Sequence, residues 1–120
     1  MKIAVTTQGK DLDAQVDARF GRAPNFLMVD SETGHFDVIP NAQSLDLPQG
    51  AGIQSAQNIL PHKPDIVLTG NCGPKAYRAL KAAGIKVAVG VKGKIADAID
   101  DYINGKYAEA TEANVDGHWG

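Results

Sequence analysis

The sequence predicts an α/β domain built on a mixed five-stranded sheet with helices on its faces. In the second half of the chain, short apolar runs typical of buried strands alternate with segments whose apolar residues recur at helical spacing. In the first half, the strand-like runs are separated by turns and loops instead. Strands that alternate with helices pair in parallel, whereas successive strands joined by turns pair antiparallel. Both kinds of pairing are therefore expected in one sheet.

Three strands are predicted before the first helix. Residues 2–6 form an apolar run that ends in a polar segment. Residues 25–30 and 35–39 flank a short turn that contains Gly34, which is typical of a β-hairpin. Residues 8–25 hold few aliphatic side chains and several charges, so we expect a long functional loop there.

Three helices alternate with two more strands in the second half. Apolar residues at helical spacing mark the helices, in residues 53–60, 76–83 and 95–103. Pro61, Gly84 and Gly105 are expected to end them. The strands between them are residues 65–69 and 86–89. With right-handed crossovers, this succession predicts the strand order 3-2-1-4-5 of the three-layer ribonuclease H-like fold, in a single domain spanning residues 1–120.

Composition and charge exclude several classes of function. The 120 residues are 43% hydrophobic and carry a net charge of −2, so the chain has no overall attraction for nucleic acid or an anionic membrane. It opens on a strand-like run without a signal peptide, and it lacks an apolar stretch near the roughly 20 residues that span a membrane. Its single cysteine, Cys72, cannot form an internal disulfide. We therefore expect a cytoplasmic protein without a nucleic-acid or membrane partner.

Three segments are expected to meet at one edge of the sheet. Ligands of open α/β sheets bind outside the carboxyl ends of the parallel strands, where the loop of residues 6–24, the segment 69–74 and the turn 89–94 converge. Gly70, Asn71 and Gly73 follow the fourth strand and lead into a helix N-terminus, whose unpaired N–H groups and dipole favour an anion. Gly50 and Gly52 open the first helix in a similar way.

Four basic side chains near these turns are candidate partners of an anion. Lys75 and Lys94 each fall in the first turn of a predicted helix, where a cation opposes the helix dipole by about 0.3–1 kcal/mol unless an anion binds there. Arg19 and Arg22 flank the dipeptide Phe20-Gly21 and can offer forked donors beside an apolar contact. The same pattern is compatible with exposed lysines and with a loop that the phenylalanine anchors in the core.

Cys72 lies between a strand end and a helix N-terminus, a setting that lowers the pKa of a thiol. A thiolate there would be a metal ligand suited to Cu(I) or iron, although a lone cysteine is commonly a small buried apolar residue. One cysteine cannot hold an iron–sulfur cubane, so a bound cluster must bring most of its own ligands. The histidines form no pair at zinc spacing, and the position of His118 is compatible both with folding back over the site and with a frayed terminus.

Several motifs taken together resemble the dinitrogenase iron–molybdenum cofactor biosynthesis family. They are residues 1–6 (MKIAVT), 17–24 (DARFGRAP), 50–54 (GAGIQ), 69–76 (TGNCGPKA) and 117–120 (GHWG). The resemblance spans essentially the whole chain and implies a ribonuclease H-like fold and a role in carrying or inserting metal clusters. Small stand-alone members from sulfate-reducing bacteria carry a molybdenum–copper sulfide cluster without covalent bonds, and other members hold the iron–molybdenum cofactor or its precursors.

The resemblance implies non-covalent carriage of an anionic metal–sulfur cluster, without catalysis. Backbone N–H groups of the glycine turns would offset the charge of such a cluster together with Arg19, Arg22 and Lys75, and Phe20 would supply an apolar wall. Members of the family often go with ParA/MinD-like ATPases, so the resemblance suggests such an ATPase as a partner.

Other functions remain open from the residues alone. Cys72 could serve a thiol-based redox sensor, although the chain has no second cysteine to resolve an oxidised form. A scaffold that binds a protein partner without a cofactor is the other alternative. A nuclease is disfavoured, because residues 2–6 lack the carboxylate that paired metal ions need in the first strand of ribonuclease H enzymes.

Overall fold

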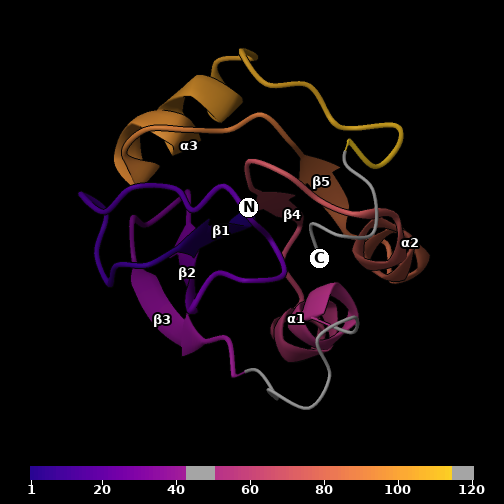
Figure 1. The fold of residues 1–120 in the computed structure, drawn as a ribbon. Helices are drawn as coiled ribbons and strands as arrows, with labels where there is room; N and C mark the ends of the chain where they lie inside the picture. Colours follow the sequence, from indigo (N-terminus) through magenta and orange to yellow (C-terminus); the bar gives the residue numbers. More distant parts are fainter. Residues whose placement is uncertain (43–50, 115–120) are drawn as a thin grey trace.

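Five strands form one mixed sheet in the computed structural model, which describes residues 1–42 and 51–114 (Figure 1). The strands are β1 (Lys2–Thr7), β2 (Asn25–Asp30), β3 (Phe36–Pro40), β4 (Ile66–Leu68) and β5 (Lys86–Ala88). β1 pairs antiparallel with β2 and parallel with β4, which places the amino-terminal strand at the centre of the sheet. The order β3-β2-β1-β4-β5 confirms the predicted topology.

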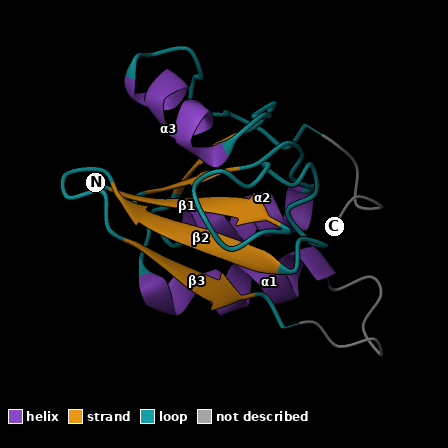
Figure 2. Cartoon of the chain, turned by 90° about the vertical axis from the view of Figure 1, so that its left-hand side faces the viewer, coloured by secondary structure: helices purple, strands orange, loops and turns teal. Residues whose placement is uncertain are grey.

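Helices cover both faces of the sheet, which gives the three layers visible in Figure 2. They are α1 (Ala51–Ile59), followed by the 3-10 turn η1 (Leu60–His62), α2 (Pro74–Ala82) and α3 (Ile95–Ile103). The chain leaves α2 and α3 through Gly84 and Gly105, both with positive φ, as expected of residues that terminate helices. No helix in the described part of the chain is long and apolar enough to cross a membrane.

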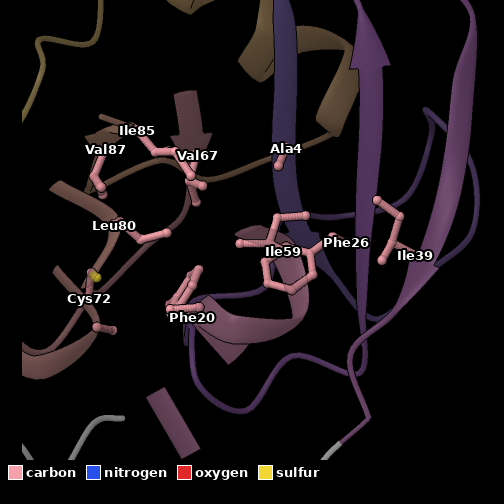
Figure 3. Close-up of a cluster of buried hydrophobic side chains, with 12 residues drawn as sticks. Ala4, Phe20, Phe26, Ile39, Ile59, Val67, Cys72, Leu80, Ile85 and Val87 are labelled. Atoms are coloured by element: carbon pink, nitrogen blue, oxygen red, sulfur yellow. The ribbon is translucent and has the colours of Figure 1, made fainter. Parts of the chain in front are cut away.

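The alternation of side chains along β1 divides the apolar core into two clusters. Ala4 points to the face that α1 and α2 cover, whereas Ile3 and Val5 point to the face that α3 covers. Figure 3 shows the first cluster, in which Phe20 packs against Phe26 with ring centroids 5.6 Å apart. Because its side chains alternate between the two faces, β1 contributes to the core beneath both helical layers.

Three isolated β-bridges fix the long loop between β1 and β2, residues 8–24, against neighbouring segments. Isolated β-bridges join Val16 to Thr7, Gln15 to Lys94 and Arg19 to Asn71. The loop therefore lies along the carboxyl ends of β1, β4 and β5, where the ligand site was expected.

Candidate anion-binding site

The loop after β1 and the turn between β4 and α2 run side by side at the carboxyl edge of the sheet. Arg19 forms a parallel bridge with Asn71, and the N–H of Phe20 donates to the Asn71 carbonyl over 3.1 Å. The N–H of Gly90, which follows β5, donates to the Gly70 carbonyl over 2.8 Å. The three segments predicted to converge therefore do so.

Buried polar side chains fix the direction of the first loop. The Thr6 hydroxyl donates to the Asp17 carbonyl over 2.8 Å and lies 2.8 Å from the Thr69 hydroxyl at the end of β4. The Asp17 carboxylate accepts the backbone N–H of Arg19 at 2.9 Å and the side-chain amide of Gln8 at 3.2 Å. Asp17 thus orients the backbone at Arg19 and forms no ion pair with its guanidinium.

The N-terminus of α2 offers hydrogen-bond donors at this edge. Its N-cap residue, Gly73, is extended and provides no side-chain cap, and Pro74 has no N–H to satisfy. Within the described residues, the N–H groups of Lys75 and Ala76 have no acceptor. The first turn of α2 contains no acidic residue, so the positive end of the helix dipole is not neutralised there.

The N-terminus of α3 is different, because the loop after β1 already occupies its donors. The N–H of Ile95 donates to the Ala14 carbonyl over 2.9 Å, and that of Ala96 donates to the Leu12 carbonyl over 3.0 Å. α3 also lies on the opposite face of the sheet from α2 (Figure 2). This arrangement contradicts the expectation that the turn at Lys94 adds donors to the same site.

Gly70 serves packing between chain segments and not the approach of a ligand. A Cβ on Gly70 would lie 2.7 Å from the Cα and 2.8 Å from the carbonyl oxygen of Ala18. The space that a side chain would need is therefore filled by the neighbouring loop.

The first turn of α1 borders the same loop. Gly52 is buried in that turn, and the Ser55 hydroxyl donates to the carbonyl of Gly21, also buried, over 3.2 Å. Gly50 and His118, two further residues predicted for the site, lie outside the described residues. α1 thus adjoins the loop that carries the two arginines.

The arginines and the phenylalanine between them point in different directions. Arg19 and Arg22 are exposed, as is Lys75 on α2. The Arg19 guanidinium has no carboxylate partner within the described residues. Phe20 is fully buried in the core between Cys72 and Phe26 (Figure 3). The expectation that Phe20 forms an apolar wall for a ligand is therefore wrong; it anchors the loop.

The Cys72 thiol is also directed into the core. Its side chain is 0% exposed, and burial raises the pKa of the thiol to about 12. The expected thiolate is therefore wrong, because desolvation outweighs the nearby helix N-terminus. The described residues contain no group of three His, Cys, Asp or Glu side chains that could hold a metal ion.

Asn114 contacts the turn before α2 and was missed from the sequence. Its carboxamide oxygen accepts the N–H of Cys72 at 2.8 Å, and its amide group donates to the Gly70 carbonyl at 3.2 Å and to the Asn71 side chain at 3.1 Å. Its own N–H donates to the Cys72 carbonyl over 3.3 Å. Asn114 lies in a polar tail without periodicity, and no local pattern separates it from its neighbours.

A cavity of about 400 Å³ lies at the other end of the strands and is separate from this site. Lys2 at the start of β1, Asp30 at the end of β2 and His62 in η1 are among the residues that line it. It shares no residue with the turns that surround the α2 N-terminus.

Comparison with known proteins agrees with the fold. The family model described as dinitrogenase iron–molybdenum cofactor matches residues 1–105. The chain belongs to this family. This membership indicates a role related to metal-cluster cofactors. Asn114 lies beyond the part of the chain that the family model matches.

Solved structures and one curated relative extend the comparison. The apo form of the orange protein from Desulfovibrio gigas has 41% sequence identity and a TM-score of 0.90, over 95% of this chain and 96% of that chain. An NMR structure from Thermotoga, provisionally described as a NifB protein, has 30% identity and a TM-score of 0.75, over 95% and 97% of the two chains. An uncharacterized protein of Methanocaldococcus jannaschii is 30% identical over 109 residues, which are 88% of either chain.

Proposed function

We propose that this protein binds and carries an anionic metal–sulfur cluster, of the molybdenum–copper sulfide or iron–molybdenum type, without covalent bonds and without catalysing a reaction. The observation that carries this proposal is the open N-terminus of α2 beside the exposed Arg19. Among the described residues, the first N–H groups of α2 have no acceptor and the neighbouring arginine has no carboxylate partner, in a protein of the dinitrogenase iron–molybdenum cofactor family.

The charges at the α2 N-terminus suit an inorganic sulfide. Terminal sulfides of a thiomolybdate-type cluster accept hydrogen bonds, and the N–H groups of Lys75 and Ala76, which no described residue accepts, can donate them. Arg19, Arg22 and Lys75 are exposed, and their side chains supply positive charge at the rim. Neither α1 nor α2 has an acidic residue in its first turn to repel an anion.

The buried position of the Cys72 thiol supports non-covalent binding. With Cys72 buried and protonated at neutral pH, no thiolate points to the rim. A cluster held there would keep its own sulfides as metal ligands, and the chain would provide hydrogen bonds and charge. We therefore no longer propose the Cys72 thiol as a metal ligand. Only the backbone of Cys72, through its N–H, is proposed to contribute to the site.

A cluster assembled from tetrathiomolybdate and Cu(I) tests the proposal directly. We expect the wild-type protein to retain visible colour after desalting, and Arg19→Gln to weaken binding about tenfold, because hydrogen bonds to charged groups are stronger than neutral ones. Arg78→Gln is the matched control, since Arg78 is an exposed arginine further along α2. Loss of binding to the same extent in both variants would indicate non-specific attraction and would contradict the proposed site.

The thiol-based sensor is the weaker alternative. A sensor cysteine needs an accessible thiolate, and the buried Cys72 has a raised pKa. Cys72→Ala separates the two functions, because a non-covalent carrier keeps cluster binding and a sensor loses its response to peroxide. A cofactor-free scaffold is tested by metal and sulfide analysis of the protein isolated from its native host. A ParA/MinD-like ATPase is the proposed partner on the strength of the family resemblance.

A further inference from the structure

We propose that residues 106–114 form a latch over the cluster site, in which the Asn114 carboxamide occupies a donor that a bound cluster would otherwise take. This inference rests on the proposed function and adds a means by which that site opens and closes.

The Asn114 carboxamide oxygen lies next to the start of α2. It accepts the N–H of Cys72 at 2.8 Å, immediately before the N-cap residue of α2. The N–H groups of Lys75 and Ala76 follow in the same turn and have no acceptor in the described part of the chain. Asn114 therefore binds one donor of a short series, as an acceptor supplied by the chain itself. An anion that engages the whole series has to displace it.

The Asn114 side chain makes two further hydrogen bonds to the turn before α2. Its amide group donates to the Gly70 carbonyl and to the Asn71 side chain, over 3.2 and 3.1 Å. These bonds give polar groups of the turn a hydrogen-bond partner while no ligand is present. They therefore favour the closed arrangement, in which Asn114 contacts the turn. The bond to Asn71 is exposed, whereas the bonds to the Cys72 N–H and the Gly70 carbonyl are partly buried. Release of Asn114 therefore leaves these two backbone groups without their partner, and a bound anion can replace the oxygen at the Cys72 N–H.

The rest of the latch is held by contacts with β5 and α2. After α3 the segment crosses towards β5 and α2 (Figure 1), where the N–H of Ala110 donates to the Val87 carbonyl over 2.7 Å. The Tyr77 hydroxyl donates to the Ala110 carbonyl over 2.9 Å, and Lys81 pairs with Glu109 over 2.8 Å. Few of these residues are buried, and exposed ion pairs contribute little. The segment can therefore open locally while the sheet stays folded.

The consequence is reciprocal coupling between the latch and the cluster. If cluster binding displaces Asn114, then loosening Asn114 must strengthen cluster binding by the same factor. Loading of the site then becomes sensitive to anything that draws residues 106–114 away from α2.

Asn114→Ala tests the latch, with Asn104→Ala as the matched control. Asn104 follows α3 in the same part of the chain, and its backbone N–H caps that helix without contact to the α2 turn. With the cluster of tetrathiomolybdate and Cu(I) as the probe, we expect Asn114→Ala to bind about five- to tenfold more tightly than the wild type, and Asn104→Ala to bind equally. In the wild type, cluster binding should also accelerate hydrogen exchange at the Ala110 amide.

The outcomes separate the latch from the proposed function. Equal affinity of the wild type and Asn114→Ala would overturn the latch and leave cluster carriage intact. Weaker binding by Asn114→Ala would make Asn114 a residue that positions the turn, which also overturns the latch. Binding by Asn114→Ala alone would support it strongly. If none of the proteins retains the cluster, the proposed function fails and the latch fails with it.

Discussion

The backbone of Ala18 lies directly against Gly70, so closely that a Cβ on Gly70 would be 2.7 Å from the Ala18 Cα. This contact brings two loops that are distant in sequence to one edge of the sheet. It sets Arg19 beside Asn71, where their backbones form a parallel bridge. The position of the arginine at the α2 N-terminus therefore depends on the absence of a side chain at Gly70.

Gly70→Ala should separate the two loops. We expect the free energy of unfolding to fall by about 1–3 kcal/mol, as for overpacking of a filled interior, and cluster binding to weaken because Arg19 shifts. Urea denaturation and cluster titration measure the two effects. Gly34→Asn is the control, because Gly34 has open space around it and asparagine tolerates its positive φ. Wild-type stability in Gly70→Ala would contradict the packing described here.

Phe20→Ala should destabilise the fold more than it changes recognition. The ring is fully buried and contacts Phe26, and truncation of a buried phenylalanine costs about 3–5 kcal/mol. Phe36→Ala, on the partly exposed edge strand β3, should cost clearly less. Urea denaturation of both variants decides the point. A variant at Phe20 that keeps full stability but loses the cluster would restore the apolar wall predicted from the sequence.

The Cys72 thiol should be unreactive in the folded protein and should make stability fall at high pH. Burial raises its pKa from 9.0 to about 12, so the folded state keeps the proton while the unfolded state loses it. The stability that this proton provides is complete below about 9 and is lost as pH rises towards about 12. We expect slow alkylation at pH 8 that becomes fast in urea. The urea midpoint should depend on pH between these values more steeply in the wild type than in Cys72→Ala.

The ion pair between Lys81 and Glu109 should make the latch sensitive to acid. The hydrogen bond from Lys81 lowers the pKa of Glu109 below its ordinary value of 4.5. A lowered carboxyl pKa stabilises the latch above that value, and this contribution is lost as pH falls through the folded-state pKa. Hydrogen exchange at the Ala110 amide should therefore lose a small part of its protection as the pH falls below 4.5, after correction for the intrinsic rate.

Glu109→Gln should remove this acid dependence, whereas Glu112→Gln should keep it, because Glu112 is exposed on the same segment without an ion pair among the described residues. The same bond raises the pKa of Lys81, so its contribution is present below 10.5 and disappears at higher pH. Protection of Ala110 that does not change with acid in the wild type would show that the pair does not hold the latch.

The sequence by itself determined the topology and the edge of the sheet at which three loops meet to form the candidate site. Period-two apolar runs, helical spacing and the glycines after α2 and α3 are local signals, and each needs only a few neighbouring residues. Right-handed crossovers then leave few ways to order five strands, and parallel strands gather their loops at one edge.

Only the tertiary structure decided which groups at that edge are available. Phe20 and Cys72 lie in motifs that suggest a ligand site, yet both side chains turn into the core. The donors at the start of α3 are taken by Leu12 and Ala14, whereas the N–H groups of Lys75 and Ala76 at the start of α2 have no acceptor in residues 1–42 and 51–114. These outcomes depend on hydrogen bonds and close packing between segments far apart in the chain. Local patterns of residues carry no information on such contacts, and Asn114 was missed for the same reason.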